Sequence, residues 1–217
     1  MRTLELFAGT QSFSKAVLRA SDQNIAVTVD ILPKFRPTIV ADIHTWDPTV
    51  YGTGYFDVVW CSPPCEQYSK ARTTGGPRDL VSADRNVLRC LQLIDYFQPR
   101  VWVIENPQTG LLPRRMDILR PGLPFYDVDY CAYGKAYRKR TRLWSNVPFN
   151  FRLCRGPGAC PSMNGTIHKG SCGNTSGRYN EELHSGVALY NVWVKDAMPA
   201  ALCDDIVRTC AERWELY

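Results

Sequence analysis

The sequence predicts an α/β fold in which one doubly wound, mostly parallel sheet forms the core. The first indication is that short apolar runs alternate with amphipathic stretches, as in strand-helix-strand units. The second is the run at residues 56 to 61, whose apolar residues do not alternate with polar ones, as in a strand buried on both faces. The third is size, because 217 residues of 45% hydrophobic content can bury one large core. No apolar run approaches the ~18 residues of a membrane span, so a membrane protein is excluded.

The expected elements follow one another along the first half of the chain. Strands are expected at residues 2 to 7, 24 to 30, 38 to 43, 56 to 61 and 101 to 105, with a helix at residues 13 to 20. The clearest helix should begin at Ser82 as its N-cap and present one apolar face at helical spacing. That face comprises Ala83, Val87, Cys90, Leu91, Ile94 and Phe97.

The second half is expected to add a late strand pair and a closing helix. The pair is at residues 126 to 132 and 142 to 147, and the helix runs over residues 199 to 213. Composition changes near Asn150, because residues 154 to 178 are rich in Gly, Ser, Asn and Cys and poor in aliphatic side chains. This stretch is expected to be a small Cys/Gly-rich insert or a long functional loop.

The cysteine count and the distribution of charge indicate the cellular compartment and the class of binding partner. Nine cysteines, an odd number, in a chain with its own core favour reduced thiols over a disulfide framework. No secretory leader is recognised, so an intracellular location, cytoplasmic or nucleoid/nuclear, is expected. Net charge is +5, and residues 135 to 155 hold seven basic residues with no acid among them, which suits a phosphate-bearing partner or a merely solvated basic face. These are Lys135, Arg138, Lys139, Arg140, Arg142, Arg152 and Arg155.

Polar residues stand where the predicted strands end, the edge at which open α/β sheets bind ligands. A tight turn at residues 7 to 10 follows the first strand, and a carboxylate follows each of the next two, at Asp30 and Asp42. Each feature alone is more often a turn or a cap. Together they predict a cofactor of the adenosine type, held by backbone at a helix N-terminus and by carboxylates at the ribose.

The fourth and fifth strands end in groups suited to covalent catalysis. Two prolines precede Cys65, which emerges into a loop rather than into the core, and the fifth strand ends in Glu105. Arg140 and Arg142 follow on the late strand pair. A thiol, an acid and cationic donors at one sheet edge predict a reaction site for an electron-poor ring.

Four segments together resemble the S-adenosylmethionine-dependent DNA (cytosine-5) methyltransferases. Residues 6 to 9 (Leu-Phe-Ala-Gly) look like the family's cofactor turn, residues 64 to 69 like its Pro-Cys loop, residues 105 and 106 like its Glu-Asn pair, and residues 138 to 142 like its Gln-x-Arg-x-Arg segment. They occur in the family's order, with a weaker match at residues 196 to 199. The departures include Gln11-Ser12 for the family's second glycine, Glu66, Tyr68, Pro107 and Arg138. The chain also leaves little room for a recognition domain, so it resembles a compact member with a reduced target-recognition segment.

The resemblance implies a Rossmann-like methyltransferase sheet and an enzyme that methylates cytosine C5 in DNA. Residues 1 to 150 would be the S-adenosylmethionine-binding catalytic domain, residues 151 to 185 the reduced recognition insert, and residues 186 to 217 a helical part closing the catalytic domain. Cys65 would add to C6 while Glu105 serves N3, Arg142 holds the base carbonyl and Arg140 holds the loop or a phosphate. In duplex DNA the base would flip out of the stack. The implied cofactor contacts are Phe7, Ala8, Gly9, Thr10, Asp30, Ile31, Asp42, Ile43, Pro64, Asp196 and Ala197.

Three thiols and an imidazole fall within nineteen residues of the insert, at Cys154, Cys160, His168 and Cys172. A structural zinc could hold such a stretch, since metal binding can replace core burial. The spacing has no Cys-x-x-Cys pair, so a Gly-rich loop with incidental thiols remains the alternative.

Two further functions compete with the DNA methyltransferase. The same chemistry could act on RNA or a free cytosine nucleotide, because the recognition segment is small. A catalytically silent nucleic-acid-binding module is the other alternative, and the presence of Cys65, Glu105 and Arg142 argues against it.

Overall fold

The computed structural model describes residues 1–70, 72, 76–170 and 197–215. In this part of the chain a seven-stranded sheet runs in the order β3-β2-β1-β4-β5-β7-β6. Its parallel strands are β1 (Arg2–Leu6), β2 (Ile25–Asp30), β3 (Ile39–Val40), β4 (Val58–Cys61) and β5 (Val101–Pro107). Strands β6 (Phe125–Asp129) and β7 (Arg140–Ser145) complete it, and β7 lies antiparallel to both β5 and β6. The predicted fold class, mostly parallel with a late antiparallel strand, is confirmed.

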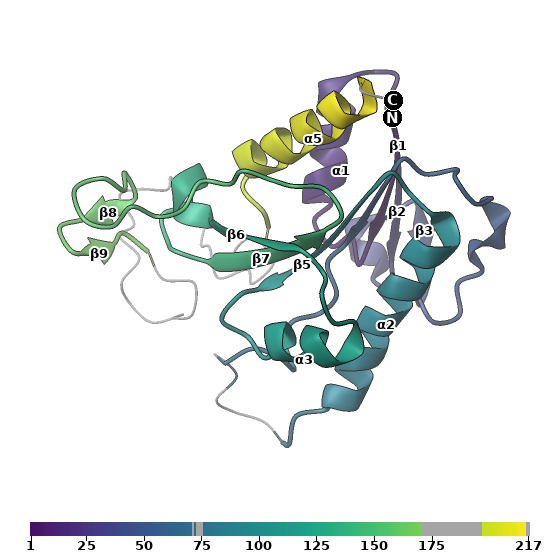
Figure 1. Ribbon diagram of the computed structural model, residues 1–217, viewed down its shortest axis with the longest axis horizontal. Coiled ribbons are helices and arrows are strands. Elements are labelled where there is room, and N and C mark those ends of the chain that lie inside the picture. Colours follow the sequence, from purple (N-terminus) through teal and green to yellow (C-terminus); the bar gives the residue numbers. More distant parts are fainter. Residues whose placement is uncertain (71, 73–75, 171–196, 216–217) are drawn as a thin grey trace.

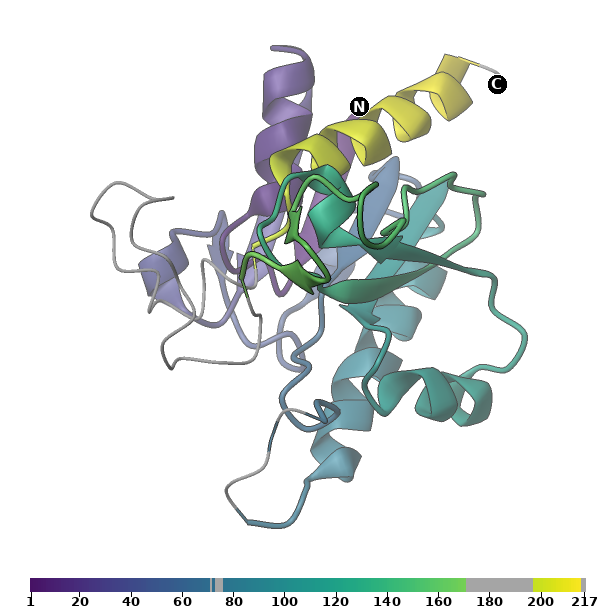
Figure 2. The same ribbon diagram turned by 90° about the vertical axis from the view of Figure 1, so that its left-hand side faces the viewer.

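Helices cover the sheet on both faces (Figures 1 and 2). Helices α1 (Ser12–Ala20) and α5 (Ala200–Glu215) pack side by side on one face, where Phe13 stacks on Trp60 with ring centroids 4.9 Å apart. Helices α2 (Leu80–Phe97) and α3 (Leu112–Leu119) belong to the core of the other face. The sheet is therefore buried on both sides, which explains why its central strands read as continuous apolar runs.

Short elements connect these layers. The 3₁₀ turns are η1 (Pro33–Phe35), η2 (Pro48–Val50) and η3 (Tyr130–Tyr133). Strands β8 (Met163–Asn164) and β9 (Ile167–His168) form a small hairpin at the end of the molecule beyond β6 and β7 (Figure 1). The dipeptide Asn164-Gly165 sits in its turn, and Gly165 has a φ of +60°, a conformation that glycine adopts without strain. No helix among the described residues is both long and apolar enough to cross a bilayer.

One expectation about the helices is wrong, and one helix was not predicted. Helix α2 is capped by Asp79, whose carboxylate accepts the backbone N–H of Ser82 at 3.0 Å, so Ser82 lies inside the first turn instead of serving as the cap. Helix α3 has no counterpart among the sequence predictions. It is only eight residues long and begins Leu-Pro-Arg-Arg, so its apolar period is too short to stand out.

A buried acid supports the start of α1. Gln11, the N-cap residue, makes no side-chain capping bond, and the carboxylate of Glu5 on β1 accepts the backbone N–H of Ser14 at 2.9 Å instead. Burial raises the pKa of Glu5 to about 7, against the opposing effect of hydrogen bonds from Ser14. Glu5 thereby joins the first strand to the first helix beneath the turn at residues 7 to 10.

Candidate functional site

The carboxyl ends of four parallel strands form one edge of the sheet. Leu6 at the end of β1 is in register with Val29 of β2 and with Cys61 of β4, and Asp30 is in register with Val40 of β3. The segments that follow these strands therefore emerge next to one another. This arrangement brings together the predicted turn, the two predicted carboxylates and the loop that carries Cys65.

The turn after β1 has an unusual backbone. Phe7, Gly9 and Gln11 have positive φ values of 56°, 46° and 57°, and a Cβ added to Gly9 would meet only the Phe7 carbonyl, at 4.0 Å. The Gly9 N–H donates to Asp30 at 2.8 Å, and the other Asp30 oxygen accepts the N–H of Leu32 at 2.8 Å. Asp30 thus fixes the turn while each of its oxygens keeps a lone pair for a further donor. Of the other predicted turn residues, Ala8 is buried and Thr10 is half-buried.

Exposure differs among the other predicted cofactor residues. Ile31, directly after Asp30, is 58% exposed, and Pro64 and Asp42 are also exposed. Ile43 is buried in the core, so its side chain does not line the rim.

The last predicted cofactor segment precedes α5. Ala197 is half-buried just before this helix, and Asp196 lies outside the described residues. Helix α5 packs against α1, which begins directly after the turn at residues 7 to 10. The helical C-terminal part therefore shares a layer with the first helix of the sheet domain.

The loop after β4 holds Cys65 in a half-buried position. The Cys65 carbonyl accepts the N–H groups of Tyr68 at 3.0 Å and Ser69 at 2.8 Å, which closes a tight turn behind the thiol. The loop is also tied to the next strand, because the buried amide of Asn106 on β5 donates to the Pro63 carbonyl at 2.9 Å. The Pro-Cys segment and the Glu-Asn pair, forty residues apart in sequence, are thus directly connected.

A buried network behind this loop was not predicted from the sequence. Tyr68 is fully buried, and its hydroxyl donates to Asp84 of α2 at 2.9 Å. Arg115 of α3 forms an ion pair with the same carboxylate, with its Nε 3.2 Å from one oxygen. Burial, followed by the Asp84 charge, raises the pKa of the Tyr68 phenol well above its usual range. The signal available in the sequence was an acid at position 84 on the apolar face of the predicted helix.

Gly110 shows how closely this loop is packed. A Cβ at Gly110 would lie 3.2 Å from the carbonyl oxygens of both Tyr68 and Pro107. The N–H of Leu111 also donates to the Tyr68 carbonyl, at 2.9 Å. The segment after β5 therefore holds the Cys65 loop from a second side, and a side chain at position 110 would push it away.

Glu105 lies at the end of β5 and is 9% exposed. The hydroxyl of Tyr130, itself completely buried, donates to Glu105 Oε1 at 3.2 Å. Burial, followed by the charge of Glu105, raises the pKa of Tyr130 well above its usual range, so the phenol stays a proton donor to this carboxylate. Glu105 is thus held by a side chain of η3, just after β6.

Arg142 is engaged differently from the prediction. Its guanidinium forms two hydrogen bonds with Asp127, at 2.7 and 2.9 Å, and lies 3.6 Å from the centroid of the Phe125 ring. It is in register with Asn106, so it shares the face of Asn106, and neighbouring Glu105 points to the opposite face. The ion pair uses Nε and Nη2 of Arg142, so Nη1 does not bond Asp127. The convergence of Arg142 and Glu105 on one ring stays a prediction.

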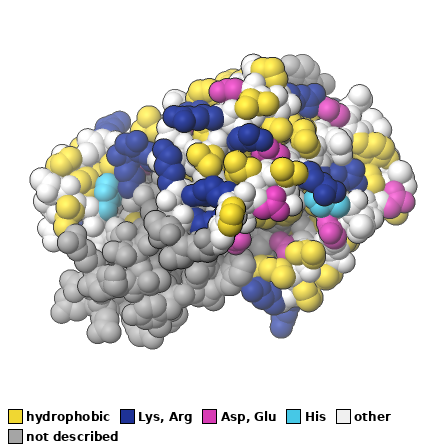
Figure 3. All heavy atoms as spheres, turned by 90° about the horizontal axis from the view of Figure 1, so that it is seen from below, with side chains coloured by type: hydrophobic (Ala, Val, Ile, Leu, Met, Phe, Trp, Pro, Cys, Tyr) yellow, Lys and Arg dark blue, Asp and Glu magenta, His cyan; other side chains and the backbone are white. Residues whose placement is uncertain are grey.

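The basic segment is partly neutralised by acids from other parts of the fold. Arg138 forms a bidentate pair with buried Asp129 at 2.8 and 3.0 Å, and Arg152 lies 3.2 Å from Asp205 of α5. Arg140 at the start of β7 stays exposed, 4.0 Å from Asp129. Figure 3 shows Lys and Arg side chains with Asp and Glu among them on the face that it presents. The absence of acids between residues 135 and 155 in sequence therefore overstates the local positive charge.

A cluster of thiols and imidazole lies beyond β6. It contains three of the residues predicted as metal ligands, Cys154, Cys160 and His168, and their ligand atoms lie within 4.8 Å of one another together with Sγ of Cys131. The predicted fourth residue, Cys172, lies outside the described residues. Cys131 was missed because it stands 23 residues before Cys154, at a spacing that carries no signal.

Comparisons with known proteins give a related sequence and a similar solved structure. No family model matches the chain. A protein of Frog virus 3 (isolate Goorha) named "Probable DNA (cytosine-5)-methyltransferase" is 39% identical over 177 residues, which cover 75% of this chain and 79% of the relative. A crystal structure from E. coli, whose description refers to a prophage-encoded DNA modification methyltransferase, aligns with a TM-score of 0.49 at 16% identity, over 67% of this chain and 46% of its own. On the strength of the viral relative, the chain belongs to the DNA (cytosine-5)-methyltransferase family.

Proposed function

We propose that this protein transfers a methyl group from S-adenosylmethionine to C5 of cytosine in DNA, through a covalent bond between Cys65 and C6. The observation that carries this function is the tie between the two reactive segments. Asn106 donates to the Pro63 carbonyl at 2.9 Å, which holds the half-buried Cys65 loop against the strand that ends in Glu105. Family membership supports the same chemistry.

The residues at the sheet edge fit the cofactor. Methionine's amino and carboxyl groups suit the backbone at the Gly9 turn, where a positive φ leaves open space above the glycine. Asp30 can accept from ribose hydroxyls with its remaining lone pairs, exposed Ile31 offers an apolar surface to adenine, and exposed Asp42 can accept from its amino group. When bound, S-adenosylmethionine supplies an electrophilic methyl group on a sulfonium.

The proton and electron movements follow from the side chains. The Cys65 thiolate adds to C6 of cytosine, and the displaced electron pair moves toward N3, where Glu105 donates a proton or hydrogen bond. C5 then becomes nucleophilic and accepts the methyl group. Loss of the C5 proton to a base restores the double bond and expels Cys65.

The two arginines take different parts in this proposal. Arg140, exposed at the start of β7, is suited to a substrate phosphate or to the loop that closes over the base. Arg142 can hold the base carbonyl through Nη1, the guanidinium nitrogen that does not bond Asp127. In duplex DNA the cytosine must flip out of the stack, because a half-buried thiol such as Cys65 cannot reach C6 of a base inside the DNA duplex.

The substrate class is tested by direct product analysis. Purified full-length protein is incubated with S-adenosylmethionine in three parallel reactions, which contain duplex DNA, RNA of the same sequence or a cytidine nucleotide. The nucleosides of each reaction are then examined by mass spectrometry. We expect 5-methylcytosine from DNA alone. If product forms only from RNA or from the nucleotide, the assigned substrate changes and the assigned reaction stays. If none of the three gives product, the result supports a catalytically silent binding module.

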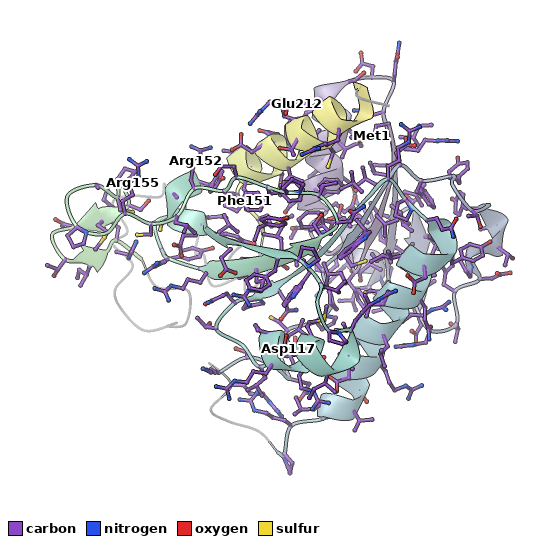
Figure 4. All side chains as sticks on the ribbon, in the orientation of Figure 1. Met1, Asp117, Phe151, Arg152, Arg155 and Glu212 are labelled. Atoms are coloured by element: carbon purple, nitrogen blue, oxygen red, sulfur yellow. The ribbon has the colours of Figure 1, made fainter. Side chains whose placement is uncertain are left out.

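Replacing Asp30 or Asp42 by alanine should weaken S-adenosylmethionine binding by about 1–3 kcal/mol each, the usual loss for a hydrogen bond to a charged group. Asp30→Ala should have the larger effect, because Asp30 also fixes the turn through Gly9. Isothermal titration calorimetry measures the change. Asp117 is exposed on α3, a helix that carries none of the predicted cofactor residues, and Asp117→Ala serves as the control (Figure 4). Unchanged affinity in both aspartate variants would move the cofactor to another site.

Binding to DNA should weaken steeply with salt, because basic side chains release counterions from phosphates. Arg155 is exposed and lies at the end of the molecule that carries the β8–β9 hairpin (Figure 4), so Arg155→Ala should lower the slope of log affinity against log salt by about one. Arg19→Ala on α1, where Arg19 pairs with Asp204, serves as the control and should leave the slope unchanged. A flat salt dependence for duplex and single-stranded DNA alike would contradict DNA as the partner.

A further inference from the structure

Four side chains from separate elements meet beyond the edge strand of the sheet. Cys131 comes from η3, Cys154 and Cys160 flank a glycine-rich turn, and His168 ends β9. All four ligand atoms lie within 4.8 Å of one another. The His168 Nε2 atom is 3.5 Å from Sγ of Cys154 and 3.7 Å from Sγ of Cys160.

These separations match the edges of a tetrahedron around zinc. Zn–S bonds of about 2.3 Å and Zn–N bonds of about 2.0–2.1 Å at tetrahedral angles place a ligating sulfur and nitrogen about 3.6 Å apart. Three thiols and one imidazole are also a complete ligand set for a closed structural site. A disulfide would use two of the sulfurs and give the imidazole no role, and calcium or magnesium would require oxygen ligands.

The local backbone shapes this site. Gly156 has a φ of +82°, which bends the chain after Cys154. The Cys160 N–H donates back to the Gly156 carbonyl at 2.9 Å and closes the turn. Such a turn brings the two sulfurs into one cluster.

The surrounding contacts connect the cluster to the sheet. The backbone N–H of Cys154 donates to Asp129 at 2.9 Å, and the Ser162 hydroxyl donates to the Cys131 carbonyl at 3.1 Å. Asp129 is the last residue of β6 and also holds Arg138. A surface cleft lined in part by Cys154 and Cys160 gives a metal ion a path to the site.

The segment has little else to hold it. Leu153 and Ile167, two of its large apolar side chains, are 54% and 58% exposed, and β8 and β9 contain two residues each. An isolated hairpin of this size is not stable in water. A metal bound by the four side chains would supply the missing folding free energy.

We propose that Cys131, Cys154, Cys160 and His168 bind one structural Zn²⁺ ion that fastens residues 151 to 170 to the edge of the sheet. Because Cys131 belongs to the sheet domain and the other ligands to the insert, the ion joins the two parts. The ion also fixes the position of Asp129, which accepts the backbone N–H of Cys154 and binds Arg138. This proposal does not depend on the methyltransferase activity.

Metal content of the purified full-length protein is the first test. We expect about one zinc per chain by plasma mass spectrometry, and after chelation the protein should take up one equivalent of Zn²⁺ or Co²⁺. Cobalt should produce the intense absorption bands of tetrahedral thiolate coordination. A folded protein that carries no zinc and takes up neither ion, or one whose cluster sulfurs are oxidised to a disulfide, would overturn the proposal.

Variants identify the ligands. Cys160→Ala and His168→Ala should lower Zn²⁺ affinity at least ten-fold, while His168→Cys should keep a four-thiolate site that binds zinc. Cys172→Ser and Cys210→Ala, the latter buried in α5, should retain one zinc per chain. Because Cys131 is buried and its variant could fail to fold, His168→Cys keeps the test independent of folding. Full zinc content in both Cys160→Ala and His168→Ala, or loss in Cys172→Ser alone, would refute this ligand set.

Discussion

Replacing Cys65 by alanine is expected to abolish methyl transfer, with a loss of at least about 10⁴-fold in kcat, because the step that activates C5 begins with sulfur adding to C6. Cys65→Ser should also be inactive, since an alcohol is a far weaker nucleophile than a thiolate. S-adenosylmethionine affinity should stay within a few-fold, because the thiol contacts the base and not the adenosine. The measurement is a methyl-transfer assay on DNA together with calorimetric titration of the cofactor.

Cys61 provides the control, four residues earlier on β4. It is completely buried, and burial, followed by the neighbouring Cys90 thiol, raises its pKa well above the usual range. Cys61→Ala should therefore reduce stability and leave turnover of the folded protein nearly unchanged. Full activity in Cys65→Ala would rule out the covalent mechanism, and equal losses in both variants would show that packing near β4 rather than thiol chemistry limits turnover.

Replacing Asp84 by alanine should lower the free energy of unfolding by about 3 kcal/mol, the second large effect. The substitution leaves the buried Tyr68 hydroxyl without its acceptor and Arg115 without its counter-ion. Arg115 keeps one third of its side chain exposed, so water recovers part of the loss. Urea unfolding at neutral pH measures the change, and turnover should fall as well because Tyr68 belongs to the Cys65 loop.

Asp95 is a matched control on the same helix. It pairs with Arg120, just past the end of α3, through hydrogen bonds of 3.0 Å, but both side chains are largely exposed. Asp95→Ala should therefore cost less than about 1 kcal/mol and leave turnover unchanged. If the two variants lose equal stability, burial does not set the importance of the Asp84 network.

Phenylalanine at position 68 separates positioning from stability. Tyr68→Phe removes only the hydroxyl, so it should cost about 1 kcal/mol while the ion pair between Asp84 and Arg115 remains. If Tyr68 positions the Cys65 loop, kcat should fall while the KM for DNA stays nearly constant. An unchanged kcat would assign the hydroxyl to folding alone.

The reactive residues at the strand ends were predictable for two reasons. Each follows or ends an apolar run in the sequence, and parallel strands of one sheet end at the same edge. Strand β4 reads as apolar and is followed by Cys65, and β5 reads as apolar up to Glu105, two residues before the strand ends. Parallel strands of one sheet end at one edge, so the two groups had to emerge near each other. Neither inference requires knowledge of any long-range contact.

The partners of the arginines were not predictable in this way. Asp127 and Asp129 lie on β6, nine or more residues before Arg138 and Arg142, and Asp205 lies on α5. Only strand register and helix packing bring these acids to Arg142, Arg138 and Arg152. The positive charge counted along the segment was therefore not the charge presented in space.

The sequence by itself determined the sheet and three of its covering helices, α1, α2 and α5. It also determined the reactive groups at the strand ends and a thiol-rich insert with too few apolar side chains for a core. These properties rest on local periodicity and residue type, which a chain carries before it folds. The tertiary structure decided that Cys131 joins Cys154, Cys160 and His168, and that Asp84 holds the Cys65 loop through Tyr68. Such contacts join residues 16 or more positions apart, and no local period encodes them, because they arise only when separate elements pack against each other.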